Sequence, residues 1–276
     1  MTLRVAIVCP QPELRMSAVK AFDRAPLDWD LRLVSEPHPE ADVVVSVGAD
    51  RAGAITMDPA HPERVIDEIV RSSSRPDVIV VVGASGGCGT TSVAVHLAAA
   101  LARRARANLV DLHSDRGAAM RLGLALDELP LADGPLLVPV AGGFRFALGP
   151  EGTSDACLET ARVAADKVVV DTPRSSLDAI ESPSRVLLVM TPTLPSVRKA
   201  AGVLLERPEL SWVPITNRTG PGSETTRVDV ERILGRKLAI ELPCSPGLRD
   251  AEDDLRLLTS PLSPWRLAVQ RLAAAL

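Results

Sequence analysis

The sequence has no tyrosine, and aromatic residues make up only 2% of its 276 residues. Proteins that bind single-stranded nucleic acid stack the bases on aromatic side chains, so this class of function is not favoured. The formal net charge of -4 also argues against an overall electrostatic design for nucleic acid. We therefore expect aliphatic cores and no specific nucleic-acid partner.

Cysteine motifs and long apolar runs are missing as well. The four cysteines, at positions 9, 88, 157 and 244, form no Cys-x-x-Cys pair, so the sequence indicates neither a disulfide framework nor a zinc site. No signal-peptide pattern and no run of about 18 apolar residues occurs. These absences predict a cytoplasmic protein whose contact with a membrane is at most peripheral.

Alternating strand and helix patterns occur in two series, which predict two α/β domains. Residues 1–72 form the first domain, and 73–77 a linker, because the stretch from Arg71 to Pro76 is polar and ends in proline. Residues 78–276 hold near-continuous apolar strands between helices, which predicts a mostly parallel, doubly wound sheet. The expected strands are 3–9, 30–34, 42–47, 78–82, 108–111, 144–148, 167–170, 185–190 and 212–216, and the expected helices are 12–24, 61–71, 195–206 and 264–276, with one more after residue 92.

A glycine-rich turn follows the first strand of the second domain, where residues 85–92 read Ser-Gly-Gly-Cys-Gly-Thr-Thr-Ser. Such a turn points backbone N–H groups and the positive end of a helix at a phosphate, and glycine lets the backbone approach closely. The plainer alternative is that these glycines only allow tight strand-to-helix packing; we favour phosphate binding. The predicted nucleotide-binding residues of the turn are Gly86, Gly87, Cys88, Gly89, Thr90, Thr91 and Ser92, with the Thr91 hydroxyl placed for a magnesium ion.

This turn resembles the deviant Walker A loop of the ParA/MinD family, Lys-Gly-Gly-x-Gly-Lys-Thr-Thr. Ser85 and Thr90 stand where the family has its two lysines. The segment 168–173, Val-Val-Val-Asp-Thr-Pro, resembles the family's Walker B strand. The resemblance implies a P-loop NTPase-like fold and places Asp171 in the magnesium shell.

Residues 109–115, Leu-Val-Asp-Leu-His-Ser-Asp, are similar to the family's switch segment, which usually reads Asp-x-Asp. Asp111 takes the first carboxylate position and adds a metal-shell residue to Thr91 and Asp171. His113 takes the second, and because no second ligand accompanies it, we interpret it as an ordinary loop histidine. Asp115 either substitutes for the missing carboxylate or is solvated.

Two weaker matches lie further along. Asn217 and Arg218 follow a strand and resemble the family's adenine-contacting segment, and 242–244, Leu-Pro-Cys, resembles its ribose-side loop. Asn217 could equally cap or turn the chain. Both interpretations of this asparagine stay open.

The cofactor implied by the resemblance is ATP or ADP with Mg²⁺, held more weakly than in the family. Losing one charge-assisted lysine contact costs about 1.5–3 kcal/mol, whereas each charge acting on the transition state contributes about 100- to 1,000-fold to the rate. Contacts from backbone amides and a metal can offset the lost binding energy, but they cannot restore the lost rate. We therefore expect nucleotide binding without efficient ATP hydrolysis.

A small α/β domain ahead of a degenerate ParA/MinD-like domain resembles the TadZ/CpaE branch, whose first domain is an atypical receiver. Residues 168–174 and 185–193 look like actinobacterial CpaE homologues, some of which are called septum site-determining proteins. The first domain looks truncated and lacks a receiver's acidic cluster, so phosphotransfer is not expected.

This resemblance implies a localisation factor for Tad-type pilus or secretion machinery, with pilus, secretion or cell-division proteins as partners, a homodimer as one arrangement, and recruitment to a pole, the septum or the inner membrane face. The alternatives are a septum-site regulator with slow ATPase activity, drawing its cation from Arg174 or a neighbouring subunit, and a nucleotide-independent adaptor.

The last predicted helix, 264–276, is amphipathic. Trp265, Val269, Leu272 and Leu276 fall on one stripe, and the helix carries only two arginines. A membrane-binding helix of this kind usually carries more basic residues. We expect this stripe to pack against its own domain.

Overall fold

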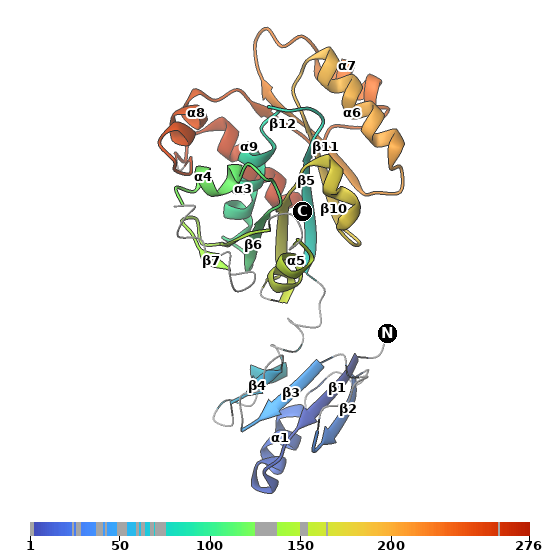
Figure 1. The fold of residues 1–276 in the computed structure, drawn as a ribbon, viewed down its shortest axis with the longest axis vertical. Helices are drawn as coiled ribbons and strands as arrows, with labels where there is room; N and C mark the ends of the chain where they lie inside the picture. Colours follow the sequence, from blue (N-terminus) through green and yellow to red (C-terminus); the bar gives the residue numbers. More distant parts are fainter. Residues whose placement is uncertain are drawn as a thin grey trace. The chain divides into compact units, whose positions relative to one another are not determined.

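The structure is a computed structural model, and it describes residues 3–23, 25, 29–36, 41, 43–48, 54–58, 61, 64–66, 69, 76–124, 137–149, 154–163, 165–258 and 260–276. The chain divides into two compact units, Met1–Arg75 and Pro76–Leu276 (Figure 1). Of the segment 73–77, which we predicted to be a linker, the structure describes Pro76 and Asp77, and Asp77 already belongs to a strand.

Unit 1 contains a parallel four-stranded sheet in the order β2-β1-β3-β4. This is the order of a flavodoxin-like sheet without its fifth strand. The receiver-like interpretation of this unit stays a prediction. The elements are β1 (Leu3–Val8), the 3-10 turn η1 (Pro12–Leu14), α1 (Arg15–Phe22), β2 (Trp29–Val34), β3 (Val43–Val47) and β4 (Ile55–Met57), and residues 64–66 and 69 of the predicted helix 61–71 are helical.

Unit 2 is built on one sheet, whose strands in the described residues run β12-β11-β10-β5-β9-β6-β8-β7. All the recorded pairings are parallel except that of β7 with β8 at one edge. The predicted α/β class with a mostly parallel sheet is therefore confirmed. The strands are β5 (Asp77–Gly83), β6 (Ala107–Asp111), β7 (Val138–Pro139), β8 (Arg145–Leu148), β9 (Lys167–Asp171), β10 (Arg185–Met190), β11 (Trp212–Thr219) and β12 (Ile240–Pro243).

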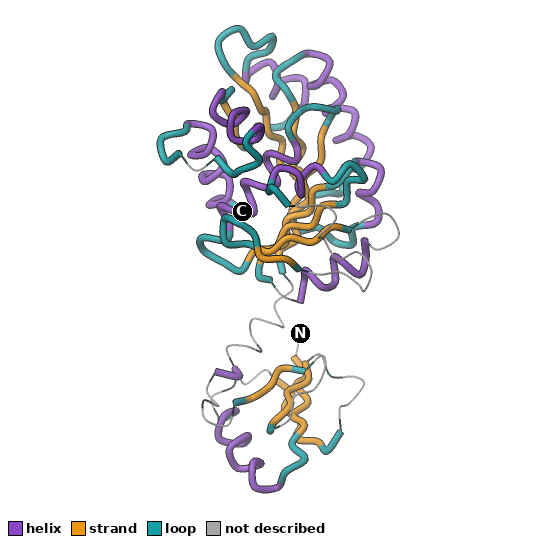
Figure 2. Tube along the Cα trace, turned by 60° about the vertical axis from the view of Figure 1, so that its left-hand side comes forward, coloured by secondary structure: helices purple, strands orange, loops and turns teal. Residues whose placement is uncertain are grey.

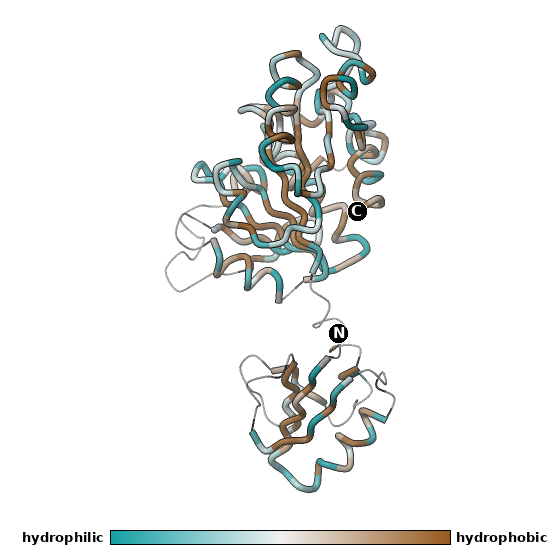
Figure 3. The backbone as a smooth tube through the Cα atoms, turned by 90° about the vertical axis from the view of Figure 1, so that its right-hand side faces the viewer, coloured by the Kyte–Doolittle hydropathy of each residue, from teal (hydrophilic) through white to brown (hydrophobic). Residues whose placement is uncertain are grey.

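Helices cover both faces of this sheet, as Figure 2 shows for the purple segments around the orange strands. On β5, Ile79 and Val81 belong to the core with α3 and α9, while Val80 and Val82 belong to the core with α5, α6 and α7. Both faces of the central strands are thus apolar, which Figure 3 shows as brown tubes. The helices are α3 (Thr90–Leu101), α4 (Gly117–Arg121), α5 (Ser154–Val163), η2 (Arg174–Ala179), α6 (Leu194–Glu206), α7 (Arg227–Leu234), α8 (Pro246–Asp253) and α9 (Pro264–Ala275).

Several of these elements were not expected from the sequence, namely α4, α5, α7, α8, β4, β7 and β12. Most of them are short, so each offers too few residues for its pattern to stand out along the sequence. Helix α7 nevertheless carries readable signals, because Thr226 and Asp229 form a capping box and Gly235 ends the helix in the left-handed conformation.

The order of the central strands decides where the functional loops meet. Strand β9 lies between β5 and β6, and its Asp171 pairs in register with Val81 on one side and Asp111 on the other. The carboxyl ends of parallel strands lie at the same edge of a sheet, which is where open α/β sheets bind ligands. The glycine turn and the two aspartates therefore come together.

Helix α9 packs against α3 and β12. Trp265, Val269 and Leu272 are buried, so the prediction that this stripe covers its own domain is confirmed. Among the described helices, none has the length and apolar character needed to cross a bilayer.

We predict that Trp265→Ala destabilises unit 2 by about 3–5 kcal/mol, because it empties a fully buried site and removes the indole N–H bond to Asn217. Thermal and urea unfolding followed by circular dichroism measures the change. Leu267→Ala on the same helix, where the side chain is 41% exposed, is the matched control and should change stability by less than about 0.5 kcal/mol. Equal effects of the two variants would contradict the packing role of Trp265.

Candidate functional site

The glycine turn joins β5 to α3. Gly87 and Gly89 have φ values of +72° and +88°, and Gly89 is the residue that precedes α3. These φ values are in the left-handed region, where a side chain is strained, so glycine is required at both positions. The turn delivers the main-chain N–H groups at the start of α3 to the edge of the sheet.

A cleft of about 850 Å³ opens over this turn. Its size falls in the range of ligand sites in proteins. It is walled by the turn, by the segments after β6 and β9, and by one face of α6. The lining residues are Gly83, Ala84, Ser85, Gly86, Gly87, Gly89, Thr90, Thr91, His113, Asp115, Arg121, Thr172, Pro173, Arg174, Lys199, Gly202 and Glu206.

Five of the predicted nucleotide-binding residues line the cleft, and four do not. The lining residues are Gly86, Gly87, Gly89, Thr90 and Thr91; the others are Cys88, Ser92, Asn217 and Arg218. A direct nucleotide contact of any of these nine stays a prediction. The structure does show what holds the four that lie away from the cleft.

Cys88 and Ser92 serve the frame of the loop. The Cys88 side chain is buried, and its sulfur lies 3.2 Å from the Thr90 hydroxyl oxygen. The Ser92 hydroxyl donates to Glu252, which also pairs with Arg121 at 3.2 Å. The first turn of α3 is thereby tied to α4 and α8.

Asn217 is buried, and both polar atoms of its amide are hydrogen-bonded. Its Nδ2 donates to the carbonyl oxygen of Cys88 at 2.9 Å, and its Oδ1 accepts from the Trp265 indole at 3.0 Å. The backbone N–H of Arg218 also donates to this Oδ1, at 3.0 Å, where β11 bulges and Arg218 takes a φ of 65°. Of the two interpretations left open for Asn217, the structure supplies contacts for the structural one, in which it clamps the loop.

Asp171 is the most unusual group of the site. It is fully buried, and neither of its carboxylate oxygens has a hydrogen-bond partner among the described residues. His113 Nε2 lies at ion-pair distance from Oδ1, beyond good hydrogen-bond geometry. A buried carboxylate that accepts no hydrogen bond is costly, so a further cation would stabilise it. This is the arrangement expected of a metal-shell residue.

Asp111 is buried beside Asp171 but already has partners. One of its oxygens accepts from the His113 backbone N–H at 2.9 Å and the other from the Ala118 N–H at 3.0 Å. Burial, and then the charge of Asp171, raise the pKa of Asp111 to about 6. Asp111 therefore orders the segment that follows β6, and any metal contact would be additional.

His113 is not the ordinary loop histidine that we expected. Its Nε2 lies 3.4 Å from Asp171 Oδ1, and its side chain lines the cleft. Contact with Asp171 raises the pKa of His113, against an opposing effect of burial. The sequence shows no second metal ligand near His113, and for that reason we assigned it no role. Its partner is instead a carboxylate on the neighbouring strand, which is distant in sequence.

Lys199 and Glu206 also line the cleft, although neither belongs to a motif of the sequence. Both belong to α6, far from the glycine turn in sequence, and a lysine on an exposed helix face carries no signal of function. Only the strand order brings this helix to the loop.

A magnesium nucleotide fits these residues. Mg²⁺ is usually held by one or two carboxylates together with phosphate oxygens. No group of three or more acidic, His or Cys side chains in the described part of the chain could hold a metal alone. Asp171 and the Thr91 hydroxyl would hold the ion, and the turn's N–H groups would hold phosphate.

Comparisons with known proteins bear on this arrangement. No protein-family model matches the chain. The maintenance of carboxysome distribution protein A of Gloeobacter kilaueensis is 36% identical over 131 residues, which cover 42% of this chain and 60% of that protein. The chain thus spans less than two thirds of this curated relative.

Solved structures match over a larger share of the chain. The ParA family ATPase of Chlorobium tepidum has a TM-score of 0.61 at 19% identity, over 72% of this chain and 99% of that one. The MinC:MinD complex of Aquifex aeolicus matches at 0.62 with 21% identity, over 72% and 95%. MinD of Pyrococcus horikoshii, with Mg-ADP, matches at 0.59 with 18% identity, over 72% and 95%.

The chain has the ParA/MinD ATPase fold. At these identities the likeness shows the fold alone. The assignment of the turn before α3 as a deviant Walker A loop, with Ser85 and Thr90 in place of lysines, stays a prediction from the sequence. The TadZ/CpaE interpretation stays a prediction.

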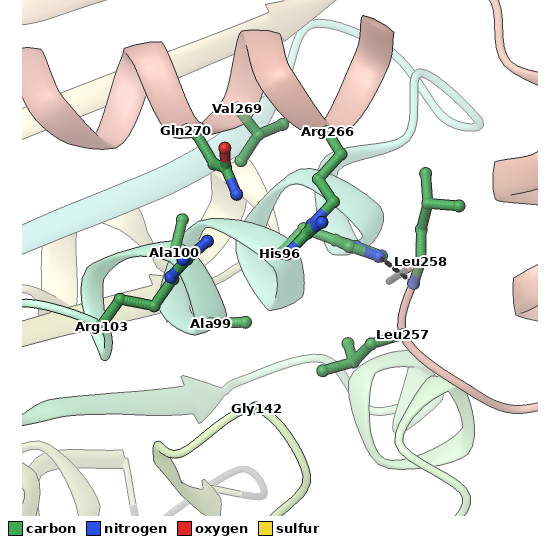
Figure 4. A pocket seen from close by; sticks show the side chains of 10 residues that line it. All are labelled: His96, Ala99, Ala100, Arg103, Gly142, Leu257, Leu258, Arg266, Val269 and Gln270. Carbon is green, nitrogen blue, oxygen red and sulfur yellow. Dashed lines mark hydrogen bonds between the residues drawn. The ribbon is translucent and has the colours of Figure 1, made fainter. Parts of the chain in front are cut away.

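A second cavity in the ParA/MinD-like unit, of about 150 Å³, is too small for a nucleotide. It lies between α3 and α9, and Figure 4 shows Arg266 and Gln270 reaching toward it from α9. His96 lies in its wall and packs edge-on against Trp265, with ring centroids 5.0 Å apart. Both imidazole nitrogens are bonded: Nδ1 to the Ser92 carbonyl at 2.9 Å, and Nε2, as acceptor, to the Leu258 N–H at 3.0 Å.

We predict that His96 makes unit 2 less stable in acid. Burial lowers the pKa of His96 below its ordinary value of 6.5, so the unfolded chain binds the extra proton. Its contribution to the free energy of unfolding is complete above pH 6.5 and is lost as the pH falls through the folded-state pKa, at about 1.4 kcal/mol per unit of lowering. Urea unfolding at pH 7.5 and 5.5 should show a smaller difference for His96→Gln than for the wild type. An unchanged difference would contradict the assignment.

Proposed function

We propose that this chain binds ATP or ADP with Mg²⁺ in the cleft of unit 2, hydrolyses it little or not at all, and uses the bound nucleotide to control an assembly partner. The observation that supports this most directly is Asp171. Among the described residues its buried carboxylate accepts no hydrogen bond and has only the 3.4 Å contact with His113, and it lies beside the phosphate-type turn. A Mg-nucleotide supplies the missing charge.

The weak turnover follows from Ser85 and Thr90. With neither lysine in the turn, the cations that would act on the transferred phosphoryl group are lost from the loop itself. Backbone N–H groups and the metal still favour the ground state. The chain is thus suited to hold a nucleotide rather than to consume it.

The cellular role that we propose is a localisation factor for Tad-type pilus or secretion machinery. This proposal is supported by the TadZ/CpaE resemblance of the sequence and by the functions for which similar proteins are named. The similar proteins are named for cell division, septum-site determination and carboxysome distribution. The last two names describe positioning, which is the class of function that we propose here.

We expect Asp171→Asn to weaken Mg-ATP binding by about ten- to hundred-fold, because it removes a charged contact to the metal. Isothermal titration with ATP in Mg²⁺ and in EDTA measures this loss, and the difference between the two proteins should collapse in EDTA. Asp155→Asn, an exposed aspartate on α5, is the matched control and should bind as the wild type. Equal Mg-ATP affinity of wild type and Asp171→Asn would contradict the metal assignment, and no binding by the wild type would rule out the proposed function.

Phosphate release tests the proposed lack of turnover. We expect the wild type to release phosphate at close to the rate of buffer alone. Turnover above that rate which Arg174→Ala abolishes would favour the slow-ATPase, septum-site alternative, because Arg174 lines the cleft directly after β9.

Partner capture separates the cellular roles. Tagged wild type loaded with Mg-ATP should retain pilus or secretion assembly proteins from a lysate of its own cells, and Asp171→Asn should retain fewer, as quantified by mass spectrometry. Retention of cell-division proteins instead would favour the septum alternative. Equal retention by both proteins would favour an adaptor that works without nucleotide.

A further inference from the structure

Helix α6 touches the glycine turn at the position where the first family lysine is missing. The Ser196 hydroxyl oxygen lies 3.4 Å from that of Ser85. Ser196 is itself buried, and its hydroxyl accepts from the Thr191 N–H at 3.1 Å. The first turn of α6 is therefore fixed against position 85.

Lys199 follows Ser196 by three residues, and residues three or four apart share one face of a helix. Gly202 and Glu206 continue the same face, and with Lys199 they line the cleft. Lys199 thus belongs to the α6 wall of the cleft that the phosphate-type turn also lines. Its four-carbon stem lets the charge adjust to a bound anion.

Lys199 is available for a ligand. In the part of the chain that the structure describes, no ion pair or hydrogen bond is recorded for its side chain, whereas Arg121 in the same cleft is paired with Glu252. Glu206 on the same helix is seven residues away, about 10 Å along the axis, which is too far for direct pairing. A Cβ on Gly202 would meet nothing within 4 Å, so there is open space beside Lys199.

Arg174 is the other cation of the cleft without a recorded partner among the described residues. It follows β9, on a different wall from α6. Among the described residues, no hydrogen bond is recorded between its segment and Ser85, whereas Ser196 lies next to Ser85 directly. The geometry therefore favours Lys199 as the substitute for the charge missing at position 85.

We propose that Lys199 binds the phosphates of the nucleotide and supplies, from α6 of the same chain, the positive charge that Ser85 lacks. This inference rests on the proposed function, since it assumes that the cleft holds a nucleotide. It assigns the compensating cation to a residue outside the loop. A positive charge thus lies near the phosphates, although the residue that carries it belongs to α6 and not to the loop.

The experiment is titration of ATP with Mg²⁺ into the full chain and its variants by calorimetry. Lys199→Gln should weaken binding by about ten- to hundred-fold, the range for a charge-assisted contact. Lys199→Arg should retain most of the affinity. Arg198→Gln is the matched control, because Arg198 is an exposed neighbour on the same helix that does not line the cleft; it should bind as the wild type.

A second variant tests the position. Adding Ser85→Lys to Lys199→Gln should recover most of the lost affinity, since the charge returns to the cleft from the other side of the Ser85–Ser196 contact. Recovery would show that the loss came from charge at this place and not from damage to α6. Circular dichroism melts of all variants should agree with the wild type.

The outcomes separate the two proposals. If the wild type binds no Mg-ATP, the proposed function fails, and this inference fails with it. If the wild type binds and Lys199→Gln binds equally well, only the inference on Lys199 is overturned. Equal losses in Lys199→Gln and Arg198→Gln, or a loss confined to Arg174→Gln, would overturn it as well.

Discussion

The shape of the phosphate-type turn depends on one buried amide. Asn217 joins the turn, through the Cys88 carbonyl, to the Trp265 indole of α9 and to the bulge of its own strand. A Cβ on Gly89 would lie 2.4 Å from the Asn217 nitrogen, so glycine and asparagine are required together. Buried networks in which every polar atom is paired hold a single geometry, because each unpaired atom would be costly. Helix α9 therefore helps to hold the loop in its conformation, through Trp265 and Asn217.

The charges around this turn differ from those of a typical phosphate loop, because negative side chains lie beneath the turn and no positive side chain lies in it. The carboxylates of Asp111 and Asp171 are buried side by side on neighbouring strands, and the loop above them has no lysine. Such a pair needs cations from elsewhere. His113 lies against Asp171 from within unit 2, and a metal and Lys199 are the further sources that we propose. In this proposal, positive charge that ParA/MinD proteins carry in the loop is supplied here by the walls of the cleft.

Much of this arrangement could be predicted from residues that act locally. The run before Gly86 is apolar and β-branched, and a glycine turn after such a strand has few conformations open to it, so the strand, turn and helix were expected. The aspartates were found because each ends a strand of the same kind. Short helices such as α8 were not expected, since eight residues make only about two turns and a pattern of that length is hard to tell from chance. His113 and Lys199 were missed for another reason: their partners lie on segments distant in sequence.

The order of residues alone establishes which chemical groups are present: a turn that offers N–H groups, strand-ending carboxylates, and no lysine in the turn. Backbone conformation and hydrophobic pattern act over a few residues, so they can be read from the chain directly. Which of these groups come into contact depends on the tertiary fold. Strand β9 pairs between β5 and β6, which brings His113 to Asp171, and α6 packs with Ser196 against Ser85, which brings Lys199 to the cleft. These contacts depend on strand order and helix packing, which are properties of the folded sheet as a whole.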